Sequence, residues 1–331
     1  MKRKGNLISE ITSFDNLCLA WYKAQRGKAA KPEVLGFEKN LNENLNQLKH
    51  QLLSNALVVG DYQYFTIHDP KKRTICAAAF SERVLHHALM NICHPVFEKH
   101  LIHDTYATRL NKGTHAALNR AVFFLKKYPC FAKLDVRKYF DSIDHQILML
   151  QLNRLFKDQN LTGVFRKIIS SYQTANNKGL PIGNLTSQYF ANHYLSGADH
   201  YALQYLKVPA FIRYMDDMLF FDNDRMVLKH KVEQFVEYLR EKLKLEVKPI
   251  IFGHHQKGLP FLGYKLYRHT TKLNKRSKKR FFTKMRKYCF NVRSGIWAES
   301  TFQAHALPLL SFLDFADTLH FRKKHTFVCE G

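Results

Sequence analysis

The stretch that decides the fold is residues 211–221, FIRYMDDMLFF. Two β-prone apolar runs flank Met215-Asp216-Asp217, and this pattern predicts a β-hairpin with adjacent carboxylates at its tip. Two like charges about 4 Å apart repel by roughly 4 kcal/mol at an effective dielectric constant of about 20. A central hairpin of this kind needs a cation at its tip, and oxygen ligands suit Mg²⁺. Taken alone, an Asp-Asp pair is more common in an exposed acidic turn.

A third carboxylate follows another β-prone run. Residues 131–136 read FAKLDV and carry Asp135 near their end. If this run and the hairpin are neighbouring strands, Asp135 converges on Asp216 and Asp217. Two Mg²⁺ ions held there would lower the pKa of a 3′-hydroxyl, align it with an α-phosphate and stabilise the leaving pyrophosphate. The three acids therefore predict nucleotidyl transfer, whereas Asp135 alone would more often end a strand or cap a helix.

The charge of the chain points to a polyanionic partner. The sequence has 52 Lys and Arg against 27 Asp and Glu, a formal net charge of +25. Surplus cations repel one another in the free protein and gain from contact with phosphate. With 46% apolar residues among 331, the chain can bury a core, which argues against overall disorder.

Cysteine usage and hydropathy bear on the compartment. The six cysteines are scattered without a CxxC pair, which favours a reducing, cytoplasmic setting. Polar residues interrupt the stretch after the basic start Met1 to Lys4, so we expect no export signal. No run approaches the roughly 18 apolar residues of a membrane span, and we expect no membrane partner.

The remaining patterns predict an α+β chain in which strands and helices are interleaved. We divide it into a helical N-terminal segment at 1–60, a mixed core at 61–268 and a helical basic tail at 269–331. The N-terminal helices break around 27–32, and a hairpin over 62–75 carries Lys71, Lys72 and Arg73 at its turn. Further predicted elements are helices at 81–97, 185–205 and 226–243, a helix start at 141–144, and a short hairpin ending at 261–264.

The tail combines an apolar face with a cationic one. Residues 272–293 hold ten Lys or Arg and no acid, while Phe281, Met285, Tyr288 and Val292 recur at helical spacing. A charge run is usually a solvated face, but one without acidic partners can follow a phosphate backbone. The tail from Thr271 is therefore expected to be mostly helical and to grip nucleic acid.

Several motifs, in order along the chain, resemble those of reverse transcriptases. Tyr214-Met215-Asp216-Asp217 resembles their YxDD signature, and residues 134–140 resemble their first palm motif. YMDD alone is a moderately specific signal, because it can arise by chance, whereas the ordered set of motifs is a strong one. The companion motifs are Pro70-Lys71-Lys72-Arg73-Thr74-Ile75, Thr105-Tyr106-Ala107-Thr108-Arg109 with Gly113-Thr114-His115, Leu180 to Gln188, and Gly258-Leu259-Pro260-Phe261-Leu262-Gly263-Tyr264.

Within the group II intron-like superfamily, the chain most resembles the reverse transcriptases of diversity-generating retroelements. Ile182-Gly183-Asn184-Leu185-Thr186-Ser187-Gln188 carries this resemblance. Most relatives have Gln before the glycine, and intron enzymes have Ser-Pro in place of Ser187-Gln188. The overall length and the opening Asn6-Leu7-Ile8 also resemble this subgroup.

The resemblance implies a right-hand polymerase, with fingers and palm over 61–268 and a helical thumb over 269–331. It implies RNA-directed DNA synthesis that copies template adenines with errors into a variable gene, in the cytoplasm of a bacterial or phage-infected cell. The implied cofactor is a pair of Mg²⁺ ions, with Mn²⁺ as an alternative. The implied partners are template RNA, a DNA or RNA primer, dNTPs and a small basic accessory protein, which we expect on the N-terminal helices or fingers.

The same resemblance assigns site residues. Asp135, Asp216 and Asp217 are the expected catalytic metal ligands, together with Val136. The expected nucleotide contacts are Lys72, Arg73, Phe140, Ile182 and Gly183, with Phe140 excluding a ribose 2′-hydroxyl unless it is a core residue. Lys72 and Arg73 would hold the triphosphate unless they stand in a solvated turn. The expected template and primer contacts are Arg109, Tyr214, Met215, Phe261, Leu262, Gly263, Lys275, Lys279 and Arg280.

Ile182 yields a hypothesis about fidelity. An amide there could hydrogen-bond the nucleotide or its pair, whereas an aliphatic side chain cannot, so selection should loosen by about 0.5 to 1.5 kcal/mol, roughly three- to tenfold. The alternative is that Ile182 packs under the palm. The particular sensitivity to adenine comes from the resemblance.

Three questions stay open at this level. Lys248 and His254 are both candidates for a general acid toward pyrophosphate. His86-His87 reads as helix surface or core more readily than as a metal pair. The alternative functions are a retron, group II intron-derived or defence-associated reverse transcriptase, or a non-catalytic RNA-binding scaffold. No ribonuclease H or endonuclease unit fits in the sequence.

Overall fold

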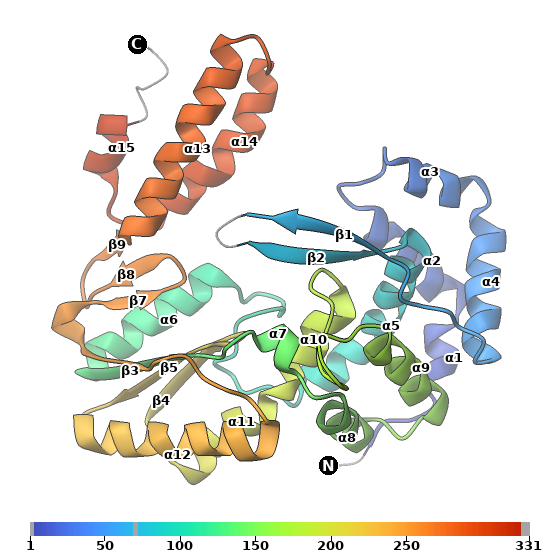
Figure 1. Ribbon diagram of the computed structural model, residues 1–331, viewed down its shortest axis with the longest axis horizontal. Coiled ribbons are helices and arrows are strands. Elements are labelled where there is room, and N and C mark those ends of the chain that lie inside the picture. The colour runs from blue at the N-terminus through green and yellow to red at the C-terminus, as the bar shows by residue number, and fades with distance from the viewer. Residues whose placement is uncertain (1–2, 69–71, 326–331) are drawn as a thin grey trace. The chain divides into compact units, whose positions relative to one another are not determined.

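The computed structural model describes residues 3–68 and 72–325 (Figure 1). The chain forms two compact units. The first comprises Met1–His103, Asp135–Leu206 and Gln234–Lys248, and the second comprises Asp104–Leu134, Lys207–Glu233 and Pro249–Gly331. The boundaries expected after residues 60 and 268 stay predictions.

Short helices open the first unit, as the apolar spacing predicts. They are α1 (Leu7–Ile11), α2 (Phe14–Gln25), α3 (Pro32–Lys39) and α4 (Leu41–Leu53), and the predicted break lies between α2 and α3. Ser13 starts α2 by accepting a hydrogen bond from the Asn16 amide. The Asn16 side chain then donates to the carbonyl of Ala88, 3.1 Å away in α5 (Phe80–Glu98). This buried bond holds α2 against α5.

The predicted fingers hairpin is present. Strands β1 (Tyr62–Ile67) and β2 (Arg73–Ala78) pair antiparallel with Tyr62 opposite Ala78. Buried Glu82 accepts hydrogen bonds from the Gly60 amide at 2.9 Å and from the Tyr62 hydroxyl at 3.4 Å, which fixes the base of the hairpin. The predicted turn residues Asp69, Pro70 and Lys71 lie outside the described residues.

Helices fill the rest of the first unit. The segment predicted as a single helix over 185–205 is helical but not continuous. The helix is interrupted at Leu195, and its last five residues form a π-helical turn. The helix start predicted at 141–144 becomes a short helix followed by a longer one, which Asp144 caps through the amides of Gln146 and Ile147. The elements are α7 (Tyr139–Ser142), α8 (His145–Leu155), α9 (Gln159–Ser170), α10 (Leu185–Tyr194), α11 (Ser196–His200) and η1 (Tyr201–Tyr205), and α12 (Arg225–Leu243) ends in this unit.

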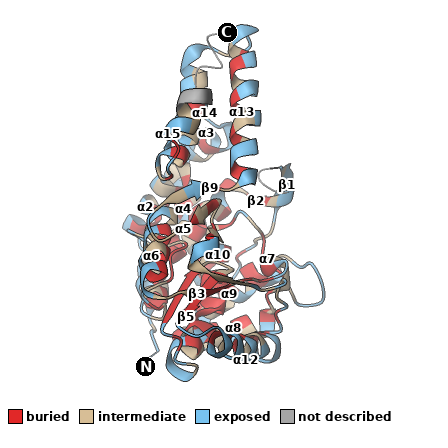
Figure 2. Cartoon of the chain, turned by 90° about the vertical axis from the view of Figure 1, so that its left-hand side faces the viewer, coloured by how far each residue is buried: buried red, intermediate tan, exposed pale blue. Residues whose placement is uncertain are grey.

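The second unit is built on an antiparallel sheet of order β4-β5-β3-β6. Its strands are β4 (Ala210–Tyr214), β5 (Asp217–Asp222), β3 (Cys130–Asp135) and β6 (Ile251–His254). The central strands β3 and β5 are largely buried, as Figure 2 shows in red. Helix α6 (Thr114–Lys127) packs on β4 and β5 and also touches β8. The apolar run of β4 is just as buried, although β4 is at the edge of the sheet.

A three-stranded sheet and the tail helices complete the second unit. The sheet contains β7 (Leu259–Phe261), β8 (Tyr264–Leu266) and β9 (Thr271–Leu273), preceded by the 3₁₀ turn η2 (His255–Lys257). The hairpin expected to end at Tyr264 instead turns at Leu262-Gly263, and Thr271 is in a strand instead of the tail helix. The tail helices are α13 (Lys275–Arg293), α14 (Glu299–Asp314) and α15 (Leu319–His325).

Among residues 3–68 and 72–325, no helix has both the length and the apolar character needed to cross a membrane.

Candidate active site

The predicted carboxylate hairpin is confirmed. Tyr214 pairs with Asp217, so Met215 and Asp216 form a two-residue connection between β4 and β5. Met215 has a φ of 55°, the positive value that the first central residue of a type II′ turn requires. A non-glycine residue in this region costs of order 1 to 3 kcal/mol, so the surroundings must hold it.

Arg213 supplies that support. It is fully buried at 0% exposure, and its Nη1 donates a hydrogen bond to the carbonyl of Met215 at 3.1 Å. Its amide and carbonyl also join residues 104 and 106, through bonds of 2.9 Å to each. Sequence reasoning missed Arg213, and the available signal was a charged residue inside an otherwise apolar strand.

Asp217 is bound by a lysine that sequence reasoning also missed. The Nζ of Lys133, on β3, lies 2.9 Å from Oδ2 of Asp217 at the start of β5. The two side chains are 17% and 18% exposed, so the pair is largely shielded from water. Lys133 also lies 5.9 Å from the ring centroid of Phe261. The lysine therefore orients the carboxylate next to the β7–β8 turn.

Asp135, the last residue of β3, is bound by Lys248. The ammonium of Lys248 bonds Oδ1 of Asp135, and its amide donates to the Asp135 carbonyl at 2.9 Å. Next to it, Val136 is buried and bridges Val247. These backbone bonds place the Lys248 side chain at Asp135.

The register of β6 separates the two candidates for a general acid. His254 pairs with Cys130, at the opposite end of β3 from Asp135. Five residues of strand between Cys130 and Asp135 correspond to roughly 16 Å. The structure therefore brings Lys248, and not His254, to a predicted catalytic carboxylate.

The donor set fits a divalent metal, although the cluster itself stays a prediction. Within the described residues, no three His, Cys, Asp or Glu side chains gather closely enough to hold a metal ion. Asp135 and Asp217 each bind a lysine ammonium instead. Carboxylate oxygens are the ligands that Mg²⁺ prefers. Asp135 belongs to the first unit and Asp216 and Asp217 to the second.

The predicted nucleotide residues Ile182 and Gly183 lie against β2. The Ile182 carbonyl accepts a hydrogen bond from the Cys76 amide at 2.8 Å, and the Ile182 side chain is half-buried. Gly183 has a φ of 124°, and a Cβ there would lie 2.9 Å from Cγ2 of Ile75 and 3.0 Å from the Cys76 carbonyl oxygen. Only glycine fits this approach. The same strand begins with Arg73, which is exposed, as is Lys72.

The rest of this motif buries polar atoms. Asn184, Thr186 and Ser187 are 3%, 0% and 1% exposed. Within the described residues, the Asn184 amide nitrogen and the Thr186 and Ser187 hydroxyls have no hydrogen-bond partner. Such groups are rare in native proteins and call for an explanation, such as a ligand or a buried water.

Phe140 is half-buried in α7. Its carbonyl accepts a hydrogen bond from the Leu180 amide at 2.9 Å, which ties α7 to the start of the 180–188 motif. Its ring lies 5.8 Å from that of Tyr139. Burial raises the pKa of the neighbouring Asp141, which the charge of Lys138 partly offsets. The structure thus joins the predicted steric residue to the predicted nucleotide motif.

The expected primer-grip residues form a tight turn. Leu262 and Gly263 have φ values of 45° and 93° and connect β7 to β8, and Phe261 before them is buried. The Ser277 hydroxyl donates to the Gly263 carbonyl at 2.7 Å. A Cβ on Gly263 would lie 3.0 Å from the Phe312 ring, so the turn packs against the tail helices.

The remaining template and primer candidates are placed as follows. Tyr214 accepts a hydrogen bond from the Thr114 hydroxyl at 3.3 Å, and Nη1 of Arg109 donates to the Thr105 carbonyl at 2.8 Å. On α13, Phe281 and Met285 are buried, so one face packs and the other is exposed (Figure 2). Lys275 and Lys279 are exposed, and the Arg280 guanidinium lies 5.6 Å from the Phe312 ring centroid.

Of the candidate histidine pair on α5, His86 is buried and His87 is half-buried. His86 is 1% exposed and lies 3.4 Å from buried Glu82. Burial, reinforced by Lys23 and His86, lowers the pKa of His87 to about 4. That the pair serves packing and not metal binding stays a prediction.

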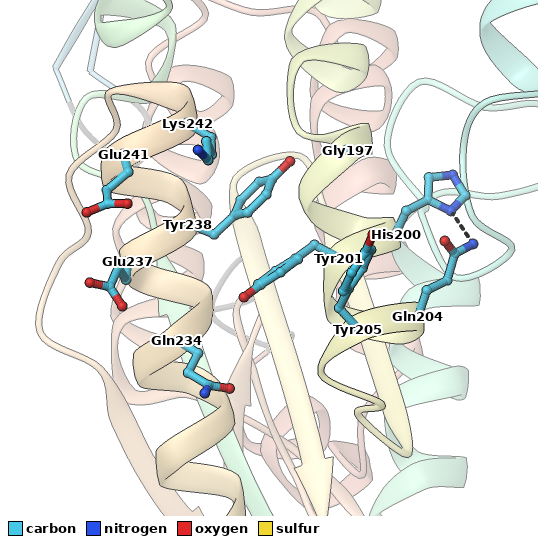
Figure 3. Close-up of a pocket in the computed structure, with 10 residues that line it drawn as sticks. All are labelled: Gly197, His200, Tyr201, Gln204, Tyr205, Gln234, Glu237, Tyr238, Glu241 and Lys242. Carbon is cyan, nitrogen blue, oxygen red and sulfur yellow. Dashed lines mark hydrogen bonds between the residues drawn. The ribbon is translucent and has the colours of Figure 1, made fainter.

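A separate cavity in the first unit contains none of the predicted site residues. It has a volume of about 480 Å³ and lies between α11, η1 and α12 (Figure 3). The Tyr201 ring stacks on Tyr238 at 4.4 Å and on Tyr205 at 5.6 Å. Glu237 and Glu241, which also line it, lie 3.6 and 3.9 Å from the same Arg240 guanidinium nitrogen.

Comparison with known proteins gives one family. The family model described as "Reverse transcriptase (RNA-dependent DNA polymerase)" matches residues 67–266, more than half of the chain. "Protein YkfC" of Escherichia coli (strain K12) is 23% identical over 72% of this chain and 77% of that protein. "Group II intron-encoded protein LtrA" of Lactococcus lactis subsp. cremoris is 24% identical over 40% of this chain, which spans 23% of that protein.

Solved structures of similar fold include a telomerase. Apo telomerase from Candida tropicalis has a TM-score of 0.52 and 13% sequence identity, covering 74% of this chain and 57% of that chain. The predicted α+β right-hand fold is confirmed by this likeness together with the antiparallel sheets and helices.

Proposed function

The chain belongs to the reverse transcriptase (RNA-dependent DNA polymerase) family, and from this we propose that it copies an RNA template into DNA by nucleotidyl transfer at Asp135, Asp216 and Asp217. The observation that carries the proposal is the YMDD hairpin, held by buried Arg213 and adjacent to β3, the strand that ends at Asp135. Template RNA, a DNA or RNA primer and dNTPs are the substrates.

The side chains have separable roles. Two Mg²⁺ ions bound by the carboxylates would activate the 3′-hydroxyl and stabilise the charge of the leaving pyrophosphate. Lys133 orients Asp217. Lys248, bonded to Asp135, is the proposed proton donor to pyrophosphate, because a general acid must lie within hydrogen-bond reach of the reacting groups.

The finer part of the proposal is error-prone copying of adenines for a diversity-generating retroelement. Its support is the segment Ile182–Gln188, in which an aliphatic residue precedes Gly183. The Ile182 carbonyl is engaged by Cys76 and its side chain offers no hydrogen bond, so one contact that could penalise a misaligned nucleotide is missing. A small basic accessory protein and a cytoplasmic location belong to this part of the proposal.

The test extends a DNA primer on a defined RNA template with Mg²⁺ and sequences the products. Wild type is compared with Asp216→Asn and with Asp15→Asn, which removes the same charge from an exposed position on α2. We expect DNA from wild type and Asp15→Asn, none from Asp216→Asn, and errors mainly opposite adenine. Accurate DNA would instead support a retron, intron-derived or defence-associated enzyme. RNA binding without any DNA synthesis would support the non-catalytic scaffold.

The role of Ile182 is tested in the same assay. Ile182→Gln should reduce misincorporation roughly three- to tenfold, whereas Ile182→Leu, which stays aliphatic, should not. An unchanged error spectrum in the Gln variant would remove Ile182 from the explanation of infidelity.

A further inference from the structure

A second cavity lies in the second unit, at the end of β3 away from Asp135. It has a volume of about 330 Å³ and is lined by residues of η2 and of the turn between β8 and β9. His255, one of these residues, donates its amide to the Pro129 carbonyl at 2.8 Å, just before β3 begins. Asp135 is six positions along the chain from Pro129, roughly 20 Å if the chain is extended. The cavity is therefore separate from the proposed catalytic carboxylates.

The lining of this cavity is cationic. Arg268 and Lys272 supply its positive charge, and none of the lining residues is acidic. The Arg268 Nε donates to the Leu125 carbonyl at 3.1 Å, which anchors the guanidinium. A cavity with this lining attracts an anion.

Tyr267 gathers two ammonium groups at this cavity. The Nζ atoms of Lys265 and Lys272 lie 5.6 and 5.8 Å from its ring centroid. The ring packs on Gly258, where an added Cβ would lie 2.6 Å from the Tyr267 ring. Tyr267 is thus held in place and keeps both lysines near the cavity.

These two lysines are also direct cross-strand partners. Lys265 on β8 pairs with Lys272 on β9 in the antiparallel register. Like charges directly opposite each other destabilise a sheet. Folding alone does not explain this pair, whereas a bound anion between or beside the two ammonium groups would.

A buried hydroxyl completes the arrangement. The Thr270 Oγ1 is buried and, within the described residues, has no hydrogen-bond partner. Thr270 lines the same cavity. A hydroxyl can donate to a phosphate oxygen, and a rotation of the Thr270 side chain toward the cavity would bring this atom to a phosphate bound there.

We propose that this cavity, defined by Tyr267, Arg268, Thr270 and Lys272, binds the phosphate backbone of an unpaired RNA strand. The choice of RNA rests on the proposed template-copying function. The chemistry is that of a phosphodiester, because cationic side chains and a hydroxyl contact phosphate without reading bases. The cavity gives the enzyme a hold on its template at a distance from the catalytic carboxylates.

The deciding variant is Lys272→Glu in the full chain. It replaces the like-charge pair with an attractive one, so the thermal unfolding midpoint should stay the same or rise. Its affinity for a fluorescent 20-nucleotide unstructured RNA should fall roughly three- to tenfold, and the slope of log K against log salt should decrease by about 0.7. A loss of binding without a loss of stability excludes misfolding as the cause.

The matched control is Lys39→Glu. Lys39 is exposed on α3 and lines neither cavity, and its reversal changes the net charge by the same amount. We expect nearly wild-type RNA affinity and salt slope. Thr270→Val, which removes the buried hydroxyl, should lower RNA affinity with no loss of stability. Equal losses of affinity in Lys272→Glu and Lys39→Glu would overturn the proposal, because only net charge would then matter.

The assay also distinguishes an RNA strand from a free nucleotide as the ligand. It further distinguishes a failure of this inference from a failure of the proposed function. If 1 mM AMP abolished the difference between wild type and Lys272→Glu, the ligand would be a free nucleotide and the proposal would be overturned. The binding assay contains no dNTPs. A wild-type protein that makes no DNA but loses RNA affinity in Lys272→Glu would refute the proposed function and leave this site standing.

Discussion

Replacing Lys133 by methionine tests whether Asp217 is a metal ligand. Lys133 and Asp217 lie 2.9 Å apart, and their side chains are 17% and 18% exposed. Breaking a fully buried ion pair costs about 3 to 5 kcal/mol, and breaking an exposed one costs about 0 to 1 kcal/mol. For a pair shielded to this degree, we expect Lys133→Met to lower the free energy of unfolding by about 2 kcal/mol in EDTA.

Magnesium should restore part of this loss. A ligand that binds only the folded state stabilises it by RT ln(1 + [L]/Kd), about 1.4 kcal/mol at tenfold Kd. In Lys133→Met the ammonium no longer competes for the Asp217 carboxylate, so 10 mM Mg²⁺ should stabilise this variant more than the wild type. The assay is urea unfolding with EDTA or with Mg²⁺, at constant ionic strength.

The other end of the same strand provides the control. Lys231 lies 2.9 Å from Asp222, the last residue of β5, and these side chains are 19% and 10% exposed. Lys231→Met should cost a similar free energy of unfolding. It should not gain more from Mg²⁺ than the wild type does. Equal Mg²⁺ responses in Lys133→Met and Lys231→Met would refute a metal site at Asp217.

Three further predictions concern the first unit. Gly183→Ala should lower the free energy of unfolding by about 2 kcal/mol in urea titrations, because its Cβ would lie 2.9 Å from Ile75 at a φ of 124°; an unchanged midpoint would contradict the geometry. Thr186→Val should raise the free energy of unfolding by about 1 kcal/mol, since the buried Thr186 hydroxyl has no hydrogen-bond partner within the described residues. A simultaneous loss of DNA synthesis would indicate that this hydroxyl contacts the substrate. Burial first, and then Lys23, lower the pKa of His87 to about 4, below its ordinary 6.5. The unfolded chain therefore takes up the proton first, and stability should fall as pH drops from 6.5 toward 4. Thermal midpoints of His87→Gln should fall less over this window, and parallel curves for the two proteins would exclude His87 as the cause of the pH dependence.

Local sequence was enough to predict the elements that position the site. The hairpin over 211–221 and the strand over 131–136 are confirmed almost to the residue, because apolar runs bounded by turn residues specify strands without reference to the rest of the chain. The helix start predicted at 141–144 is equally local, since the Asp144 cap needs only the next three residues.

Local periodicity failed where packing interrupts an element. The pattern over 185–205 is helical throughout, yet the helix is interrupted at Leu195, resumes as α11 and ends in the π-helical turn η1. The turn at Leu262-Gly263 was likewise not where the sequence predicted it. Leu262 has a positive φ there, and the turn is held through Gly263, whose carbonyl accepts a hydrogen bond from Ser277 and which packs on Phe312. Such contacts join residues that are distant in sequence.

The sequence by itself determined the family of motifs, the α+β pattern and the identity of the carboxylates, because these depend on residue type and short spacing. Only the tertiary structure decided which side chains bind them. Strand neighbours bring Lys133 to Asp217, and backbone bonds bring Lys248 to Asp135. The register of β6 with β3 sets His254 opposite Cys130, and that of β8 with β9 sets Lys265 opposite Lys272. Strands β3 and β6 are far apart in the sequence, so no local pattern encodes their register, whereas the turn between β8 and β9 sets that of the second pair locally.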